Sequence, residues 1–210
     1  MTKEKILPTI GFIVAAYIWT NVAYRKGKIL EIEYFSMWIG YMLKRSIDAL
    51  FIHIRSNQQD TNLFMFFMEW TYLWSFSSNI SNEIYTPEFI RPDNWIIILG
   101  ILIFSVGLIC NTYVHLQLRS FKKANNGVKL IPTGFLFEYV SCPHYFFELL
   151  TWLGFYIASQ TMYSLMFLMT ALLITTTWGK SKHMNYIKQF NGEKDKPKYP
   201  NRKIIIPFIY

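Results

Sequence analysis

The sequence predicts an all-α protein, a polytopic membrane bundle of about six transmembrane helices that ends in a cytoplasmic amphipathic segment. Three observations support this class. Hydrophobic residues make up 52% of the 210 residues and aromatic residues 19%, whereas charged residues make up only 16%. Soluble domains carry about 25% charged residues. The apolar residues also gather in runs of about 20, the length that a helix needs to cross a bilayer. This composition excludes a disordered or fibrous protein.

Six apolar segments account for the expected helices. They lie at about 6–24, 34–54, 63–80, 95–118, 146–159 and 161–178. The first run continues past Ala15-Ala16 without a small-residue cleavage site, so we interpret it as a retained anchor rather than a signal peptide. Charged residues interrupt the second, and only Ser159-Gln160-Thr161 separates the fifth from the sixth. We expect residues 1–210 to form one membrane domain.

The distribution of lysine and arginine predicts which side of the membrane each loop faces. Segments 119–129 and 179–203 hold more than half of the 21 basic residues. Because short loops rich in Lys and Arg stay in the cytoplasm, both segments should be cytoplasmic. The acidic segment from Glu83 to Asp93 should then lie on the opposite side. The loop with Arg25, Lys26 and Lys28 departs from this pattern, because it would lie outside the cytoplasm. Glu31 and Glu33 offset part of its positive charge.

Charge and cysteine content narrow the function. The net charge of +8 suits nucleic acid, anionic lipid or a phosphorylated ligand, and its position beside apolar segments favours the last two. Cys110 and Cys142 are expected to be reduced packing residues. The sequence contains no GxGxxG, P-loop, HExxH, CxxC or GxSxG pattern, which argues against a Rossmann site, zinc hydrolysis, serine hydrolysis and disulfide exchange, and no metal site is expected.

Ionisable residues inside apolar helices are costly, so each is a candidate functional residue. Lys44 and Asp48 are four residues apart and can pair on one helix face, either as a structural pair or as part of a site. Asn111, His115 and Arg119 recur every four residues and therefore share one face. This stripe suits a phosphorylated ligand whose phosphates stay at the membrane surface, although hydrogen bonding between helices would explain it as well.

The segment from Ser141 to Glu148 opens the fifth helix. Pro143 is suited to the first turn of a helix, because a backbone N–H at this position has no partner within the helix and its absence in proline costs nothing. Tyr145 and Glu148 should face the same way, although a tyrosine at this depth is also a common interfacial anchor. The tail is predicted to turn at Asn191-Gly192, and its apolar end, residues 204–210, should dock onto an apolar surface.

Several separated motifs together resemble a known family. The run 134–148, GFLFEYVSCPHYFFE, is followed by WLGF at 152–155, and further matches lie at 44–45, 50–53, 178–190 and 206–208. This set resembles the C-terminal signature, here 134–210, of the steroid 5-alpha-reductase family. The Ser-Cys-Pro-x-Tyr form is similar to that of the very-long-chain trans-2-enoyl-CoA reductases. The resemblance covers roughly 40–210.

The resemblance implies a multi-pass endoplasmic-reticulum enzyme that uses NADPH to reduce the double bond of a long-chain trans-2-enoyl-CoA, the last step of each fatty-acid elongation cycle. Its expected partners are membrane lipid and other elongation enzymes. Lys44 and Tyr145 match the proposed catalytic pair of the enoyl-CoA branch. Positions that match the family's cofactor site, or lie in the same region, are Asn111, His115, Arg119, Lys122, Lys129, His144, Glu148, Lys182, His183, Tyr186 and Arg202.

Three positions depart from the family pattern. His144 stands where the enoyl-CoA branch usually has Asn, and His115 stands where the steroid branch has Asp. The family often has a tyrosine two residues before the lysine, whereas Tyr41 precedes Lys44 by three. This difference of one residue rotates the tyrosine by about 100° around the helix axis. These departures leave the pair of Lys44 and Tyr145 in place.

Three alternatives stay open. The first is a steroid, sterol or polyprenol reductase of the same family, although the steroid branch relies on a glutamate in an early helix and segment 6–24 has none. The second is an isoprenylcysteine methyltransferase, whose Arg-His-Pro-x-Tyr pattern becomes Ser-Cys-Pro-His-Tyr here. The third is a non-enzymatic protein that shapes the bilayer and uses its positive charge to bind anionic lipid.

Overall fold

The structure is a computed structural model, described for residues 3–26, 31–52, 63–124, 130–192 and 197–207. Helices make up most of these ranges. The β-structure among the described residues is limited to isolated β-bridges. The all-α prediction is therefore confirmed. The elements are α1 (Lys3–Arg25), α2 (Ile32–Ile47), the π-helix η1 (Asp48–Ile52), α3 (Leu63–Ile84), α4 (Asn94–Ala124), the 3-10 helix η2 (Phe135–Glu138), α5 (Pro143–Ser159) and α6 (Met162–Gln189).

Each expected apolar segment coincides with one helix, and the main differences lie at the ends. The second segment contains a change of geometry, because α2 passes into η1 at Asp48. The sixth continues past residue 178 to Gln189, so the basic stretch after it is helical as well. Two helices of the described residues, α4 and α6, are long and apolar enough to cross a membrane.

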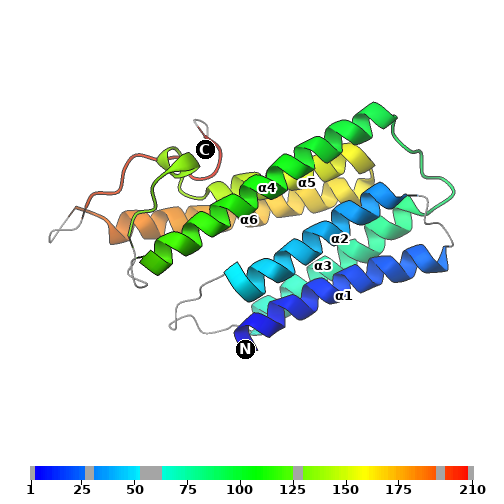
Figure 1. Cartoon of the computed structure of the whole chain (residues 1–210), viewed down its shortest axis with the longest axis horizontal. Coiled ribbons are helices and arrows are strands. Elements are labelled where there is room, and N and C mark those ends of the chain that lie inside the picture. Colours follow the sequence, from blue (N-terminus) through cyan, green and yellow to red (C-terminus); the bar gives the residue numbers. More distant parts are fainter. Residues whose placement is uncertain (1–2, 27–30, 53–62, 125–129, 193–196, 208–210) are drawn as a thin grey trace.

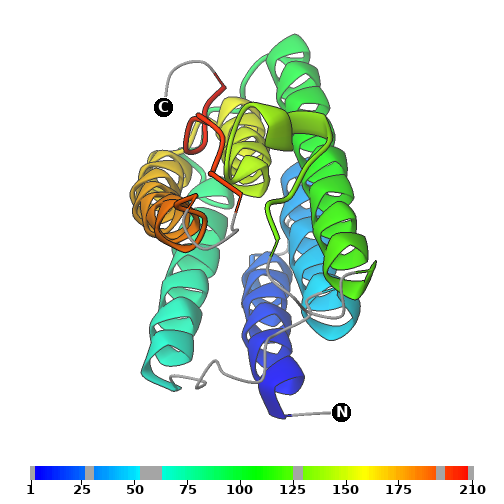
Figure 2. The same ribbon diagram turned by 90° about the vertical axis from the view of Figure 1, so that its left-hand side faces the viewer.

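The helices form two groups of three. Helices α1, α2 and α3 lie together, and α4, α5 and α6 lie beside them with the tail at one end (Figure 1). The end-on view shows the same grouping (Figure 2). Small residues allow α4 and α5 to approach closely, because a Cβ at Gly107 would lie 2.6 Å from the backbone nitrogen of Thr151. Such contacts are typical of helix packing in membranes.

Aromatic side chains fill the space between the two groups. Trp19 and Trp38 of the first group lie with ring centroids 5.1 Å apart, and Trp38 lies 5.5 Å from Trp152 of α5. Trp152 in turn contacts Phe167 of α6 at 4.4 Å. All four side chains are buried. Because each large aromatic side chain buries about 150 to 250 Å², this cluster is an extensive apolar connection between the groups.

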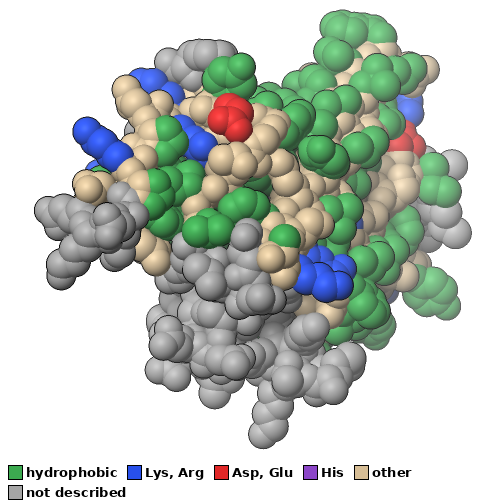
Figure 3. Space-filling view, turned by 60° about the vertical axis from the view of Figure 1, so that its left-hand side comes forward, with side chains coloured by type: hydrophobic (Ala, Val, Ile, Leu, Met, Phe, Trp, Pro, Cys, Tyr) green, Lys and Arg blue, Asp and Glu red, His purple; other side chains and the backbone are tan. Residues whose placement is uncertain are grey.

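The outer side of the bundle is apolar. Exposed residues on α4 recur along one side of the helix, namely Trp95, Ile98, Leu102, Val106, Ile109 and Tyr113. Apolar side chains cover large areas of the space-filling view, whereas Lys and Arg gather in small groups (Figure 3). An apolar outer face of this extent is expected of a helix that meets lipid.

The break between α5 and α6 has a local cause. Gln160 takes a left-handed conformation with φ 46° and ends α5. Thr161 then caps α6 by accepting a hydrogen bond from the Ser164 N–H at 3.2 Å. The Glu83 carboxylate at the end of α3 also accepts hydrogen bonds from the Met162 and Tyr163 N–H groups, at 2.9 and 3.0 Å. A carboxylate at a helix N-terminus is favourable because it meets unpaired N–H groups and the positive end of the helix dipole.

The tail returns to the start of α5. Gly192, with φ 82°, makes the predicted turn after α6. The chain then runs beside Ser141 and Cys142, whose N–H groups donate to the carbonyls of Lys203 and Ile204 at 2.8 and 3.0 Å. Ile205 is 1% exposed and packs in one cluster with Cys142 and Tyr145. The predicted docking of the apolar end is thus confirmed for 204–206, and 208–210 lie outside the described residues.

Candidate active site

Polar side chains meet at the junction of α2, α4 and α5. The Lys44 ammonium lies 2.6 Å from the Asp48 carboxylate one turn along the chain, and it donates a hydrogen bond to Asn111 Oδ1. The Asn111 amide nitrogen donates to the carbonyl of His144 at 2.7 Å. Lys44 is therefore linked through Asn111 to the first turn of α5. The expected pair of Lys44 and Asp48 forms within this polar cluster, and a role of the pair at a functional site stays a prediction.

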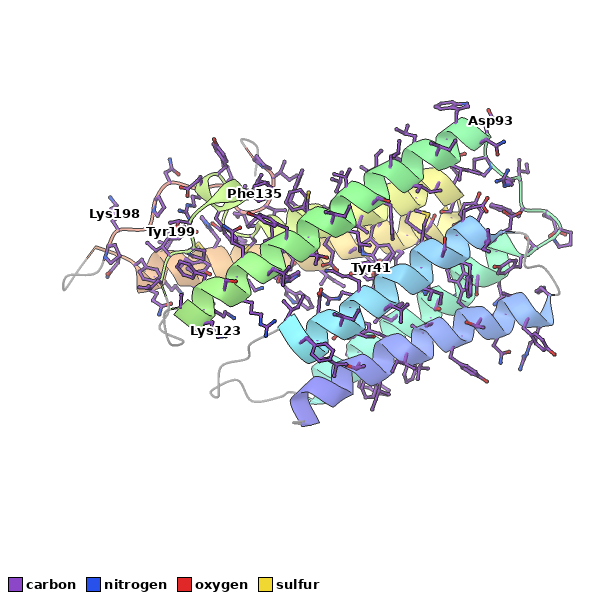
Figure 4. The ribbon with its side chains drawn as sticks, in the orientation of Figure 1. Tyr41, Asp93, Lys123, Phe135, Lys198 and Tyr199 are labelled. Atoms are coloured by element: carbon purple, nitrogen blue, oxygen red, sulfur yellow. The ribbon has the colours of Figure 1, made fainter. Side chains whose placement is uncertain are left out.

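Glu148 of α5 joins the same cluster. Its Oε1 accepts a hydrogen bond from the Tyr41 hydroxyl, and its Oε2 lies 3.9 Å from the Arg45 guanidinium. Arg45 also lies over the ring of Phe12, at 5.4 Å from the centroid. Tyr41 lies near the middle of the molecule, between α2 and the second helix group (Figure 4). Tyr41, which stands one residue away from the family's tyrosine, therefore directs its hydroxyl at Glu148.

The side chain of Tyr145 is buried, and a different lysine contacts it. The Lys182 ammonium of α6 lies 4.6 Å from the centroid of the Tyr145 ring and 3.3 Å from His144 Nε2. The rings of His144 and Tyr145 are 4.2 Å apart. Within the described part of the chain, the Tyr145 hydroxyl has no hydrogen-bond partner. Among the described residues, hydrogen bonds lead from Lys44 through Asn111 to the carbonyl of His144, the residue before Tyr145, whereas Lys182 contacts the Tyr145 ring directly.

A second cluster forms where the tail crosses the end of α6. The rings of Tyr186 and Tyr199 stack with centroids 5.4 Å apart, and the Arg202 guanidinium lies 5.6 Å from the centroid of Tyr199. Arg202 donates to the carbonyl of Pro132 at 2.7 Å. Tyr199 and Arg202 border a cavity of about 630 Å³, whose lining is His183, Ile187, Phe190, Asn191, Lys198, Tyr199, Pro200, Asn201 and Arg202.

The other expected cofactor residues lie at varying distances from these clusters. His115 is buried on α4 with its ring 5.6 Å from that of His144. Arg119 and Lys122 are exposed on the last turns of α4. Lys129 lies outside the described residues. Tyr41, Arg45, Ser141 and Tyr199 are contact residues that the motif comparison did not assign. The sequence could have indicated Tyr41 and Arg45 as site residues, because they lie one turn apart on the helix that carries Lys44.

The polar residues around Lys44 are called the inner cluster, and those where the tail crosses the end of α6 are called the outer cluster. The inner cluster has balanced charge, and the outer cluster is positive. Lys44 and Arg45 face two carboxylates, those of Asp48 and Glu148. The described lining of the cavity contains two cations, Lys198 and Arg202, and no carboxylate. Beyond the apolar segments, burial raises the pKa of the Cys142 thiol to about 11 and lowers the pKa of His183. The outer cluster therefore suits a ligand with anionic or acceptor oxygens.

The fold and these clusters define an all-α protein whose buried polar residues converge on the start of α5, beside a cavity bordered by cations. Comparison with known sequences agrees with this class. The family model described as 3-oxo-5-alpha-steroid 4-dehydrogenase matches residues 59–210. The chain belongs to this family, the steroid 5-alpha-reductases.

The similar proteins include enoyl-CoA reductases and steroid dehydrogenases. The chain is 33% identical over 170 residues to the very-long-chain enoyl-CoA reductase of Dictyostelium discoideum, covering 80% of the chain and 55% of that protein. It is 29% identical to a probable very-long-chain enoyl-CoA reductase of Caenorhabditis elegans, covering 86% and 59%. It is also 27% identical to rat 3-oxo-5-alpha-steroid 4-dehydrogenase 1, covering 97% and 76%. The chain thus spans little more than half of the first two relatives.

Proposed function

We propose that this protein is a very-long-chain trans-2-enoyl-CoA reductase that uses NADPH to reduce the 2,3 double bond in the last step of fatty-acid elongation. The main support is the convergence of Lys44, Asn111, Tyr145 and Glu148, from three helices, at the start of α5. Two relatives named very-long-chain enoyl-CoA reductases support the acyl-CoA substrate.

In this proposal Tyr145 is the general acid. Reduction at C3 of the enoyl thioester leaves negative charge on the thioester oxygen as an enolate, and C2 then takes a proton. The Tyr145 hydroxyl has no partner among the described residues, so it is available to donate that proton. A nearby cation stabilises the enolate oxygen and the phenolate. Lys44 is the proposed cation, and the contact between Lys182 and the Tyr145 ring makes Lys182 a second one.

The residues of the outer cluster fit NADPH. The cavity of about 630 Å³ is within the range of ligand sites, and its described lining provides two cations and the ring of Tyr199. The Arg202 side chain is 3% exposed, and its Nε has no hydrogen-bond partner in the described part of the chain. We propose that Arg202 and Lys198 hold phosphate, and that Asn111, His144, Glu148 and Tyr186 border the remainder of the cofactor. NADPH, when bound, supplies the hydride.

We further propose that all six helices span the endoplasmic-reticulum membrane, with the C-terminal segment in the cytoplasm. The apolar outer face of α4 supports contact with lipid. Lys123 and Lys198 lie at one end of the molecule, and Asp93 lies at the other (Figure 4). An excess of Lys and Arg at one end is typical of the cytoplasmic side. Other elongation enzymes are the proposed protein partners.

A steroid reductase is the second candidate. The rat 3-oxo-5-alpha-steroid 4-dehydrogenase 1 matches almost the whole chain, and the chain covers more of that protein than of the enoyl-CoA reductases. Both candidates share NADPH and the reduction of a carbon–carbon double bond conjugated to a carbonyl. They differ in the substrate, so the choice between them is an experimental one.

The test is NADPH oxidation by the purified protein. A long trans-2-enoyl-CoA and a steroid enone are supplied in parallel, and binding of S-adenosylmethionine is measured as a control for a methyltransferase. We expect oxidation with the acyl-CoA alone. Tyr145→Phe should lower kcat by at least about 100-fold, the usual contribution of a general acid, with the Kd for NADPH within about twofold of wild type. Oxidation only with the enone would favour the second candidate, and a fully active Tyr145→Phe protein would refute the assignment of the acid.

A further inference from the structure

Two buried polar side chains, Ser141 and Tyr199, and the partly buried His183 come from separate segments and form a chain of hydrogen bonds that ends at the cavity. The Tyr199 hydroxyl of the tail donates to Ser141 Oγ at 2.8 Å. Ser141 Oγ lies 2.6 Å from Nδ1 of His183 on α6. Ser141 and Tyr199 are 3% and 8% exposed, so water does not readily replace either contact. His183 also lines the cavity.

The direction of the first bond determines the second. Because Ser141 accepts from Tyr199, its own proton needs another acceptor, and the partner that the described residues offer is His183 Nδ1. A ring nitrogen accepts a hydrogen bond only when it carries no proton, and a neutral imidazole then carries its proton on the other nitrogen. Were Nδ1 protonated instead, the buried Ser141 hydroxyl would keep a donor without an acceptor, and an unpaired buried donor is unfavourable because it has lost its hydrogen bond to water.

The surroundings of His183 also favour its neutral form. The charged groups that border the same cavity are Lys198 and Arg202, and Lys182 precedes His183 on α6. The one carboxylate described near this cluster, that of Glu138, lies 3.9 Å from Arg202 and is about half exposed. Tyr186 and Tyr199 are the other titratable groups that pack there. An imidazolium would therefore meet mainly like charge.

We propose that Tyr199 and Ser141 are positioning residues that hold His183 as a neutral imidazole with its proton on Nε2, a donor for an acceptor oxygen of the ligand in the cavity. The tautomer follows from the hydrogen-bond chain and does not depend on the enzyme's reaction. The ligand class rests on the proposed function, in which the acceptor is a phosphate, ribose or carboxamide oxygen of NADPH. The cations supply charge, and His183 supplies a directed hydrogen bond without adding to it.

The first test is nitrogen NMR on the whole protein with labelled histidine. The chain has four histidines, and His183→Gln identifies the signals of His183. We expect an unprotonated Nδ1 and a protonated Nε2 at neutral pH in the wild type. Tyr199→Phe should give a mixture of tautomers, because Ser141 can then accept from Nδ1–H. Ser141→Ala should do the same, and Ser141→Thr should restore the wild-type signals.

Tyr163→Phe is the matched control, since this tyrosine lies at the other end of α6 and its side chain is exposed. It should leave His183 unchanged. A wild-type protein with a proton on Nδ1 would overturn the proposal, whether or not the variants fold. Identical tautomers in wild type, Ser141→Ala and Tyr199→Phe would overturn it as well.

The second test measures NADPH binding by fluorescence. Ser141→Ala and Tyr199→Phe should raise the Kd by about 2- to 13-fold, which corresponds to one net hydrogen bond of about 0.5 to 1.5 kcal/mol. An unchanged Kd in both variants would refute His183 as a ligand donor. Failure of wild-type protein to bind NADPH, with the expected tautomer present, would instead refute the proposed function and leave the hydrogen-bond chain intact.

Discussion

Lys44 illustrates how much a single buried ammonium depends on its neighbours. Its side chain is 11% exposed and that of Asp48 is 1% exposed, so both charges are largely removed from water. Such a pair adds little net stability over apolar residues of similar size, but removal of one partner leaves an uncompensated charge. The pair is therefore better explained by the position it gives Lys44 beside Asn111 than by its contribution to folding.

This interpretation predicts an asymmetric effect of substitution. Asp48→Leu should lower the free energy of unfolding by about 3 to 5 kcal/mol, because Lys44 is then buried without its counter-ion. Lys44→Met combined with Asp48→Leu should recover most of that loss. Denaturation in detergent measures both proteins against the wild type. A double variant as unstable as Asp48→Leu would show that the two side chains act separately.

The buried thiol of Cys142 should make the folding stability depend on pH. Its pKa rises from 9.0 to about 11 because the thiol is buried before α5. Above pH 9.0 the unfolded thiol loses its proton while the folded thiol keeps it, so folding stability contributed by this group is present below pH 9.0 and declines up to about pH 11. Unfolding temperatures of wild type and Cys142→Ala should therefore converge over this range. A constant difference across it would contradict the assignment.

Helix contacts decide the behaviour of whole elements. Gly107 faces α5, and an added Cβ would lie 2.6 Å from both the backbone nitrogen and Oγ1 of Thr151. Alanine is the better helix former by about 1 kcal/mol, but separation of two packed helices costs more, typically about 1 to 3 kcal/mol. The steric term should decide the sign because backbone atoms cannot move aside as a flexible side chain can.

Gly107→Ala is thus expected to lower the unfolding temperature. Gly40→Ala provides the matched control, because a Cβ there meets no atom within 4 Å. It should leave the unfolding temperature unchanged or raise it. Thermal unfolding in detergent compares the two. Equal effects would mean that α4 and α5 are further apart than described.

At the scale of the molecule, the proposed orientation in the membrane is directly testable. Single cysteines introduced at Lys123 and Lys198, at one end, and at Asp93, at the other, occupy exposed positions (Figure 4). A membrane-impermeant maleimide applied from the cytoplasmic side should label the first two and leave the third unlabelled. Wild-type protein measures the reaction of the two natural cysteines. Labelling of Asp93→Cys from the cytoplasmic side would contradict the proposed topology.

The helices could be predicted because their causes are local. An apolar run of about 20 residues specifies a helix by its length and composition, and the break at 159–161 and the turn at Asn191-Gly192 follow from residues at those positions. Helix ends were less predictable. The spacing after Lys180 is compatible with a helix, but the end of α6 at Gln189 was visible only in the structure, where Tyr186 in its last turns stacks on Tyr199 of the tail.

The helical class, the family resemblance and the pair of Lys44 with Asp48 follow from the amino-acid sequence alone, because spacing along one helix settles which neighbours share a face. Contacts between helices became visible only in the tertiary structure. Lys44 meets Asn111 across 67 positions, and Tyr41 meets Glu148 across 107. It also placed Lys182, rather than Lys44, over the ring of Tyr145. The register and rotation of packed helices determine such contacts, and neither is encoded in the period of a single helix.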